Sequence, residues 1–204
     1  MSTSVPAEPA GKTPDELVER LFGASIGMFD ILSVYIGDRL GLYRALHAGG
    51  PATAADLAAR AGIDERYARE WLEQQAVTAI LEVDDVAAVA ADRRYALPEA
   101  YAAPLLDPAS PWSMAPLARS LVGCAMVLPQ LLDAYRSGGG VEWADYGPDM
   151  IEAQGDFNRP WLVGSFGSEI LPAIPAIHDR LGRDGARVAD VACGVGWASI
   201  AIAR

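Results

Sequence analysis

The clearest potential for chemistry lies in residues 189–204, whose sequence is ADVACGVGWASIAIAR. Residues 187–191, at the start of this region, are a short run with two β-branched valines, which predicts a buried parallel strand. After this run, Gly194 and Gly196 permit backbone angles and a close ligand approach that a Cβ would block. From Trp197 the pattern becomes helical, so free N–H groups and the positive end of the helix dipole would face the glycine turn. Strand, turn and helix together predict half of a site for a nucleotide-type cofactor.

The residues of the turn discriminate between cofactors. A dinucleotide fingerprint requires Gly-x-Gly-x-x-Gly, whereas Ser199 stands at the third glycine position and the bulky Trp197 begins the helix. A pyrophosphate would therefore fit poorly. A tight strand-to-helix turn that binds no ligand is the alternative interpretation.

The same turn resembles a known cofactor motif. Asp190-x-Ala192-x-Gly194-x-Gly196 resembles the first motif of class I S-adenosylmethionine (SAM)-dependent methyltransferases, acidic-x-Gly-x-Gly-x-Gly, with Ala192 in place of the first glycine. The resemblance implies SAM as the cofactor, with the backbone of Ala192, Cys193, Gly194 and Gly196 around its methionine part. Asp190 would help to shape that pocket.

A second resemblance lies upstream. The stretch FNRPW at residues 157–161, followed by Ser165, resembles the Phe-Asn-x-x-Met-x-x-x-Ser stretch of small-molecule O-methyltransferases, with Trp161 in place of the methionine. It implies that Asn158 and Ser165 contact the cofactor and that Phe157 and Trp161 line the substrate pocket.

Other interpretations of this region remain open. The stretch could be a helix N-terminus with Asp156 or Asn158 as its cap and a core stripe made by Phe157, Trp161, Leu162 and Phe166. Tyr146 is a further candidate for the substrate pocket, although an aromatic set such as Trp143 and Tyr146 more commonly packs in a core. No residue identifies a catalytic base or the methyl acceptor, which could be oxygen, nitrogen or carbon.

The N-terminal half carries strong helix signals. A capping box and a proline predict a helix start at Thr13, and its apolar stripe runs to Leu40. Gly23, Gly27, Gly37 and Gly41 interrupt this stripe, which predicts close helix packing or a break around Gly37. Such a face would suit a homodimer formed through the N-terminal helices.

A helix-turn-helix comes next. Thr53 begins a capping-box-like helix that ends at Gly62, and Asp64 caps a second helix over residues 65–77. Short strands are expected over residues 79–83 and 94–97, forming a hairpin wing.

A winged helix suggests a DNA-binding regulator, but its charges argue against nucleic acid as a partner. Arg66 faces Glu70 and Arg69 faces Glu73 at i, i+4 spacing, so the second helix neutralises itself. The wing adds two arginines and three aspartates, namely Arg93, Arg94, Asp84, Asp85 and Asp92. DNA binding usually needs several uncompensated Lys or Arg contacts.

Residues 40–85, followed by RRYALP at residues 93–98, resemble the N-terminal winged-helix dimerisation module of class I small-molecule methyltransferases. In that family the module pairs subunits and helps to close the substrate pocket. The resemblance implies a homodimer and a small-molecule methyl acceptor as partners. A non-catalytic dimerisation protein is a third possibility beside the enzyme and the regulator.

Between these motifs the sequence predicts connecting helices. Residues 98–116 are proline-rich and should be irregular with one short helix, while residues 117–136 form a helical candidate that contains Pro129. Ser137 and the three glycines after it would end that helix as a flexible joint. A helix over residues 169–181, kinked by two prolines, should precede the strand.

Composition sets the broad class. The 204 residues are 51% hydrophobic with a net charge of −11, which is typical of a globular protein and repels phosphate backbones. The longest uncharged apolar stretch, residues 120–132, is shorter than the roughly 18 residues of a membrane span. Cys124 and Cys193 are expected as free thiols, and His47 and His178 lack metal-site spacing. The N-terminus has no apolar signal region, so we expect a cytoplasmic location.

We therefore expect a mostly α chain in four parts: a tail (1–12), a winged-helix domain (13–110), connecting helices (111–183) and the start of a Rossmann-like cofactor domain (184–204). Its function would be SAM-dependent methyl transfer to a small molecule. A central parallel strand needs partner strands on both sides, and residues after the first motif supply them in such enzymes. The sequence-based hypothesis is a truncated frame whose last residues form no complete site.

Overall fold

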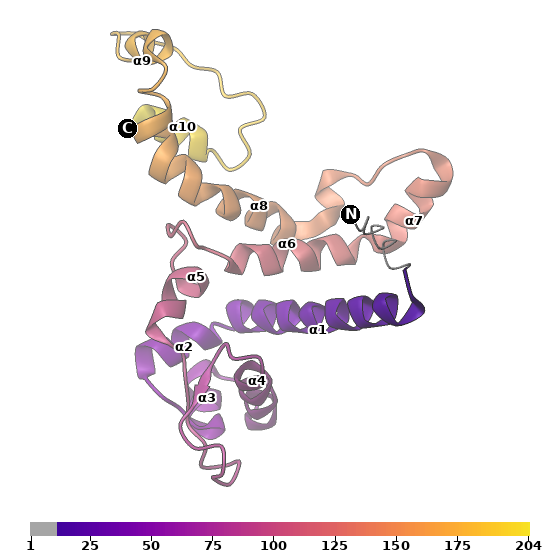
Figure 1. Cartoon of the computed structure of the whole chain (residues 1–204). Helices are drawn as coiled ribbons and strands as arrows, with labels where there is room; N and C mark the ends of the chain where they lie inside the picture. The colour runs from indigo at the N-terminus through magenta and orange to yellow at the C-terminus, as the bar shows by residue number, and fades with distance from the viewer. Residues whose placement is uncertain (1–11) are drawn as a thin grey trace, which may run out of the picture.

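The computed structural model describes residues 12–204, so the predicted tail lies outside the described residues except for Lys12. Helices dominate the described part (Figure 1). In chain order the elements are α1 (Pro14–Arg39), α2 (Leu42–Gly49), α3 (Ala54–Ala61), α4 (Glu65–Val77), β1 (Glu82–Val83), β2 (Tyr95–Ala96), η1 (Glu99–Tyr101), α5 (Ala102–Leu106), α6 (Ala115–Met126), α7 (Leu128–Ser137), η2 (Trp143–Tyr146), α8 (Gly147–Trp161), η3 (Leu162–Ile170), α9 (Pro175–Leu181) and α10 (Trp197–Ala203).

Local signals set the boundaries of the winged helix as predicted. Thr13 and Thr53 each form a complete capping box at the start of α1 and α3. Gly62 ends α3 with a left-handed backbone, φ 68°, and the Asp64 side chain accepts a hydrogen bond from the amide of Arg66 at the start of α4. The wing is confirmed but shorter than expected, because the antiparallel strands β1 and β2 have only two residues each.

The main hydrophobic core lies in this domain. Leu42, Leu57 and Leu72, from α2, α3 and α4, are fully buried. Polar groups inside the core are satisfied: the Tyr43 hydroxyl donates to Gln75, and the Trp71 indole N–H donates to the Ser33 carbonyl at 2.9 Å. Three helices and the wing thus share one interior, which fixes the end of α1 against them.

The predicted break around Gly37 is wrong, because α1 is continuous from Pro14 to Arg39. The alternative, close packing at this glycine, is confirmed. A Cβ at Gly37 would lie 2.5 Å from the Tyr43 ring and 2.6 Å from the Trp71 ring. The glycine therefore removes a side chain where two aromatic rings press on the helix, and the chain turns only at Gly41, whose φ is 67°.

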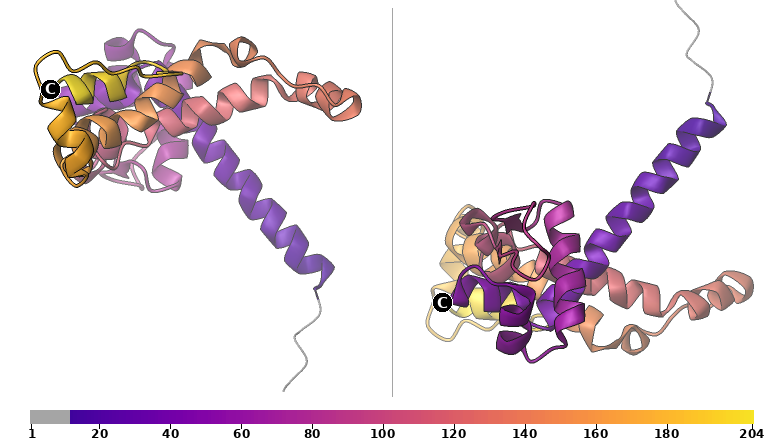
Figure 2. Two further views of the ribbon diagram at one scale, coloured as in Figure 1. Left: turned by 90° about the horizontal axis from the view of Figure 1, so that it is seen from above. Right: turned by 90° about the horizontal axis from the view of Figure 1, so that it is seen from below.

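Two helical segments extend away from the body. The N-terminal half of α1 projects in one direction and α7 in another (Figure 2). The single helix expected over residues 117–136 is wrong: the chain divides at Val127 into α6 and α7, which are bent by 55°, and Pro129 lies in the first turn of α7. No single helix among the described residues is long and apolar enough to cross a membrane; the bent pair α6 and α7 passes that test by length and composition only.

The connecting helices form the centre of the molecule. α6 packs against α1 on one side and against α8 on the other (Figure 1). α8 begins at Gly147, so the interpretation of residues 156–158 as a helix N-terminus is wrong; these residues lie near its C-terminal end. A π-helix, η3, continues directly from α8, and the helix predicted over residues 169–181 is α-helical only from Pro175.

The strand predicted over residues 187–191 is not formed. This segment is irregular, and Val188 and Val191 are 52% and 88% exposed. Among residues 12–204 no other strand lies beside it, and an extended segment needs a hydrogen-bonded neighbour to become part of a sheet. The helix predicted after the glycine turn is confirmed as α10.

Candidate functional site

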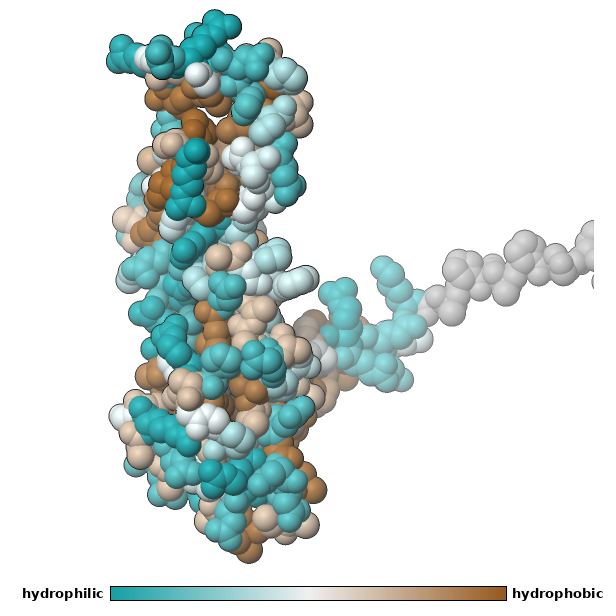
Figure 3. All heavy atoms as spheres, turned by 90° about the vertical axis from the view of Figure 1, so that its left-hand side faces the viewer, coloured by the Kyte–Doolittle hydropathy of each residue, from teal (hydrophilic) through white to brown (hydrophobic). Residues whose placement is uncertain are grey.

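A cavity of about 450 Å³ lies between α8 and the glycine loop, which we define as residues 190–196. α8 and the start of η3 form one wall, and the glycine loop with the first turn of α10 forms the other. Figure 3 shows one face of the molecule, on which hydrophilic and hydrophobic residues are mixed. The lining residues are Trp143, Ile151, Gln154, Gly155, Asn158, Leu162, Asp190, Ala192, Cys193, Gly194, Val195, Trp197 and Ala198. We call this space the glycine-loop cavity.

The backbone of the glycine loop has three positive φ angles. Gly194 and Gly196 have φ of 57° and 85°, and a Cβ at either position would meet open space. Ala192 has φ 58°, a conformation that costs a residue with a Cβ roughly 1–2 kcal/mol. The left-handed backbone at Ala192 explains why a glycine would suit this position, and strain of this kind is concentrated at functional sites.

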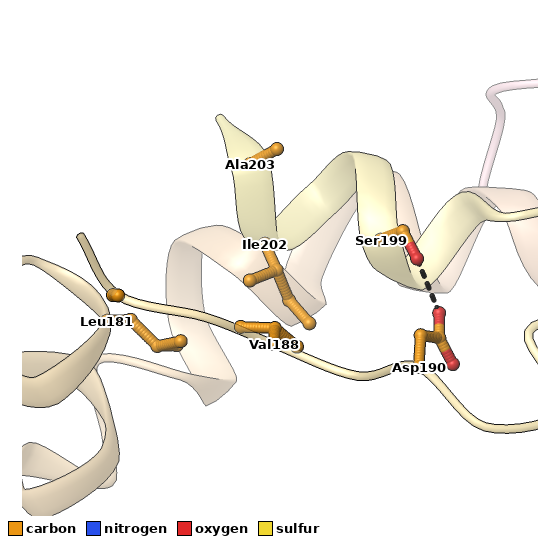
Figure 4. Close-up of a pocket in the computed structure, with 7 residues that line it drawn as sticks. Leu181, Val188, Asp190, Ser199, Ile202 and Ala203 are labelled. Carbon is orange, nitrogen blue, oxygen red and sulfur yellow. Dashed lines mark hydrogen bonds between the residues drawn. The ribbon is translucent and has the colours of Figure 1, made fainter.

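Asp190 is fixed by the helix that comes after the loop. Its carboxylate accepts a hydrogen bond of 2.7 Å from the Ser199 hydroxyl on α10 (Figure 4). Both residues also line a second cavity of about 430 Å³ on the other side of the segment, beside Val188 and Ile202. The bond ties the first residue of the loop to the first turns of α10, so loop and helix form one unit.

The glycine loop lies against α8 at Val195. A Cβ at Gly155, which is buried, would lie 2.3 Å from a Val195 methyl group and 3.2 Å from the Val195 Cβ. Val195 can approach α8 to this distance only because residue 155 has no side chain. Both residues line the glycine-loop cavity.

A cation–π contact joins α8 to α10, the helix that follows the glycine loop. The Arg159 guanidinium carbon lies 4.6 Å from the centroid of the Trp197 ring. The Trp197 indole N–H is buried without an acceptor among the described residues. An unpaired buried donor in a cavity wall is a group that a polar ligand could satisfy.

The structure brings five predicted cofactor residues together around one cavity. Asn158 comes from α8, and Asp190, Ala192, Cys193 and Gly194 come from the loop more than thirty residues later. That these side chains and backbone groups bind a cofactor stays a prediction.

The other predicted site residues lie outside this lining. Gly196 caps α10 beside the cavity, and Ser165 lies on the π-helix η3. Trp161 is 53% exposed and packs on Phe166, while Phe157 is 46% exposed. The aromatic residue that η2 contributes to the cavity is Trp143, against which Tyr146 packs at 5.7 Å between ring centroids.

Sequence reasoning missed several residues of the site, among them Ser199 and Gly155. In the sequence Ser199 stands out only as a departure from a dinucleotide fingerprint, yet it holds Asp190. Gly155 gives no sequence signal of its own, since its role depends on Val195, forty residues later. For Ser199 the sequence offers one signal: an acidic residue, Asp190, is followed by a helix that has a hydroxyl side chain in its first turn.

The ion pairs of the winged helix differ in part from those predicted. The Arg66–Glu70 pair is confirmed at 3.9 Å, but the predicted Arg69–Glu73 pair is wrong, because Glu73 lies 3.8 Å from Arg93 of the wing instead. The wing reaches back over α4, so the carboxylate of Glu73 takes a partner outside its own helix. Within residues 12–204 no cluster of three His, Cys, Asp or Glu side chains could hold a metal ion.

Comparison with known proteins places the N-terminal domain. Residues 27–106 match the model of the Rv2258c-like winged HTH domain. These residues are a winged helix-turn-helix domain of the Rv2258c-like type. The Rv2258c-like domain thus includes half of α1, the helix-turn-helix and the wing, and it ends at α5. No curated protein sequence matches the chain significantly.

Solved structures extend the similarity beyond the Rv2258c-like domain. The mitomycin 7-O-methyltransferase MmcR is similar with a TM-score of 0.56 and 22% identity over 75% of this chain and 46% of its own. PigF, solved with SAH, has a TM-score of 0.56 and 21% identity over 94% of this chain and 55% of its own. Human N-acetylserotonin methyltransferase, solved with SAM, has a TM-score of 0.55 and 17% identity over 82% and 51%. The chain thus shares their fold and spans about half their length.

Proposed function

We propose that this chain is the N-terminal part of a SAM-dependent methyltransferase that acts on a small-molecule acceptor. The observation that carries the proposal is the glycine-loop cavity, where Asn158 of α8 meets the acidic residue and the glycine turn of the predicted cofactor motif. The likeness to methyltransferases of known structure supports it, since two of them are described with SAM or SAH.

The residues present fit the methionine end of SAM better than a pyrophosphate. The loop has open space at Gly194 and Gly196, an acidic side chain at Asp190 and an unpaired indole N–H at Trp197. A carboxylate in this loop would repel a pyrophosphate, whereas the ammonium group of a methionine moiety would favour it. These residues would hold the amino-acid part of the cofactor.

When bound, SAM supplies a methyl group that moves from its sulfonium sulfur to the acceptor, leaving SAH, while the acceptor loses a proton to solvent or a base. The chain's own contribution is therefore positioning. Ser199 orients Asp190, Gly155 lets the loop lie against α8, and Trp143 closes the cavity at η2. The described residues supply walls and polar contacts for binding and orientation.

The proposal is tested by adding SAM to the isotope-labelled chain and following its amide resonances. We expect shifts at Asp190, Gly194 and Trp197, reproduced by SAH and weakened at least tenfold by Asp190→Ala, because the variant loses a charge-assisted contact. NAD is the matched control, since its pyrophosphate should not fit the loop. Shifts with NAD instead of SAM, or none with millimolar SAM, would contradict the proposal.

We also propose that α1 pairs with α1 of a second copy. The N-terminal half of α1 projects from the body (Figure 2). It exposes large apolar side chains, since Leu17, Val18, Leu21, Phe22, Ile26, Met28 and Phe29 are between 47% and 67% exposed. Gly23 and Gly27 lie four residues apart in this region, and a Cβ at either would meet nothing within 4 Å. Exposed apolar area with a small-residue stripe suits the close approach of another helix. A two-fold pairing would bury both stripes at once.

Replacing Phe22 and Phe29 by glutamate should convert a dimer into a monomer, because four charged side chains would then enter one interface. The molar mass in solution, measured by light scattering, reports this change. Val86→Glu is the control, since Val86 is also exposed, at 72%, but lies in the wing. A wild-type chain that is monomeric at its highest soluble concentration would refute the pairing.

A further inference from the structure

A third cavity, of about 450 Å³, lies where α1, α2, α5, α6 and α8 meet, and we call it the arginine cavity. Four arginines line it, each from a different helix. The lining residues are Asp38, Arg39, Arg44, Leu105, Leu106, Asp107, Pro108, Ser113, Ala115, Pro116, Arg119, Asp156 and Arg159. None of these residues is a member of the predicted cofactor motif.

Two of the four guanidinium groups are already neutralised. Arg119 lies 3.2 Å from Asp38 and 2.8 Å from Asp156, and Arg39 lies 3.4 Å from Asp149.

Arg44 and Arg159 differ from this pair, because neither lies within 4.0 Å of a carboxylate in the described part of the chain. The Nε of Arg159 is buried and has no acceptor there. A buried guanidinium donor without an acceptor is costly, and a bound carboxylate or phosphate would satisfy it.

The rest of the lining selects between these anions. The lining is mainly polar, and Leu105, Leu106 and Pro108 provide a small apolar surface near α5, which would suit the body of a small organic molecule. The lining holds four arginines and three aspartates, so one negative charge would balance it, whereas a doubly charged phosphate would leave an excess of negative charge. The cavity therefore suits a small carboxylic acid with an apolar body.

The arginine cavity adjoins the glycine-loop cavity. Arg159 lines the first and stacks at 4.6 Å on Trp197, which lines the second. Its neighbour Asn158 lines the glycine-loop cavity from the same helix. A molecule held by Arg159 would thus lie one side chain away from the proposed cofactor.

We propose that Arg44 and Arg159 bind the carboxylate of a small organic acid, and that such an acid is the substrate class of the methyl transfer, an assignment of substrate that rests on the proposed function. The acid would lie against Leu105 and Leu106, with its carboxylate at the guanidinium of Arg159. The atom that accepts the methyl group would lie on the side facing Trp197.

Benzoate is the probe, with benzamide as its neutral counterpart and phenyl phosphate as the dianionic one. We expect saturation-transfer NMR on the whole chain to show benzoate binding more tightly than both. Arg159→Met and Arg44→Met should each weaken benzoate binding about tenfold, since each removes a charge-assisted contact. Arg20→Met makes the same charge change on the exposed, projecting part of α1 and should leave binding unchanged.

Equal binding of benzoate and benzamide, or equal loss in Arg20→Met, would overturn the proposal, and tighter phenyl phosphate would reassign the cavity to phosphates. Circular dichroism identifies a variant that fails to fold, and Arg159→Lys then keeps the charge and should retain part of the affinity. SAM titration of the same samples separates the two proposals. If the chain binds benzoate but not SAM, the proposed methyltransferase function is rejected and the carboxylate site is retained. If it binds SAM but not benzoate, only the carboxylate site is rejected.

Discussion

Replacing Arg119 by methionine is expected to lower the free energy of unfolding by about 3–5 kcal/mol, the usual cost of removing one partner from a buried ion pair. Arg119 extends from α6 to Asp38 of α1 and Asp156 of α8, and its side chain is only 12% exposed. The variant removes the cation that lies between the two carboxylates. Urea unfolding followed by circular dichroism measures the loss.

The free energy of unfolding that Arg119→Met loses, its stability deficit, should depend on pH in a defined direction. Burial raises the pKa of Asp38 above its ordinary value, with Arg119 acting in the opposite direction. Folded Asp38 therefore binds its proton more tightly than unfolded Asp38, and stability falls as the pH rises from the ordinary pKa through the raised one. Without Arg119 that pKa rises further, so the deficit should be full at neutral pH and should shrink on acidification.

Arg136→Met is the matched control. Arg136 pairs with Asp133 at 2.7 Å, but the two side chains are 72% and 79% exposed, so the loss should be about 1 kcal/mol or less. Equal losses in the two variants, or a deficit for Arg119→Met that grows on acidification, would show that the ion triad does not carry this stability.

Replacing Gly155 by valine should abolish measurable SAM binding by the chain. The new Cβ would lie 2.3 Å from a Val195 methyl group, so the glycine loop has to move away from α8. The cavity walls would then separate, and contacts to one ligand from Asn158 and the loop could not form together. Isothermal calorimetry with SAM measures the loss, which should exceed about tenfold.

Two further variants make this result specific. Gly164→Ala changes a glycine of η3 that has open space around its Cβ position, and it should leave SAM binding unchanged. Val195→Ala removes the methyl groups nearest to Gly155. The double variant Gly155→Ala, Val195→Ala should therefore bind SAM more tightly than Gly155→Ala alone. Full binding by Gly155→Val, or no rescue by the combined variant, would reject the close contact as a determinant of the site.

The sequence predicted the helix bounds of the winged helix well because local chemistry sets them. Thr53 caps a helix three residues before its acidic partner, and Gly62 ends the same helix through a conformation that glycine adopts freely. The Asp64 cap and the α4 bounds are set in the same way. Each signal acts within one turn of the chain, so a single sequence is sufficient to identify it.

Features that depend on distant partners were predicted poorly. Residues 187–191 have the composition of a strand, but strand formation requires a neighbour that residues 12–204 do not supply. Glu73 pairs across the wing with Arg93 instead of with its own helix. The candidate site divides similarly: the glycine loop was recognisable as a motif, whereas Gly155 and the arginine cavity emerge only when α8 meets its neighbours.

The adjacent positions of Asn158 and Arg159 on α8 limit the insertions and deletions that the helix can accept. Two consecutive helical residues point about 100° apart, and here the first faces the glycine-loop cavity and the second the arginine cavity. An insertion or deletion before them would rotate both at once. One helical register therefore couples the linings of two cavities. The π-helix η3 starts only after this pair. Its wider turns change the direction in which later side chains point, but they do not change which cavity Asn158 and Arg159 face.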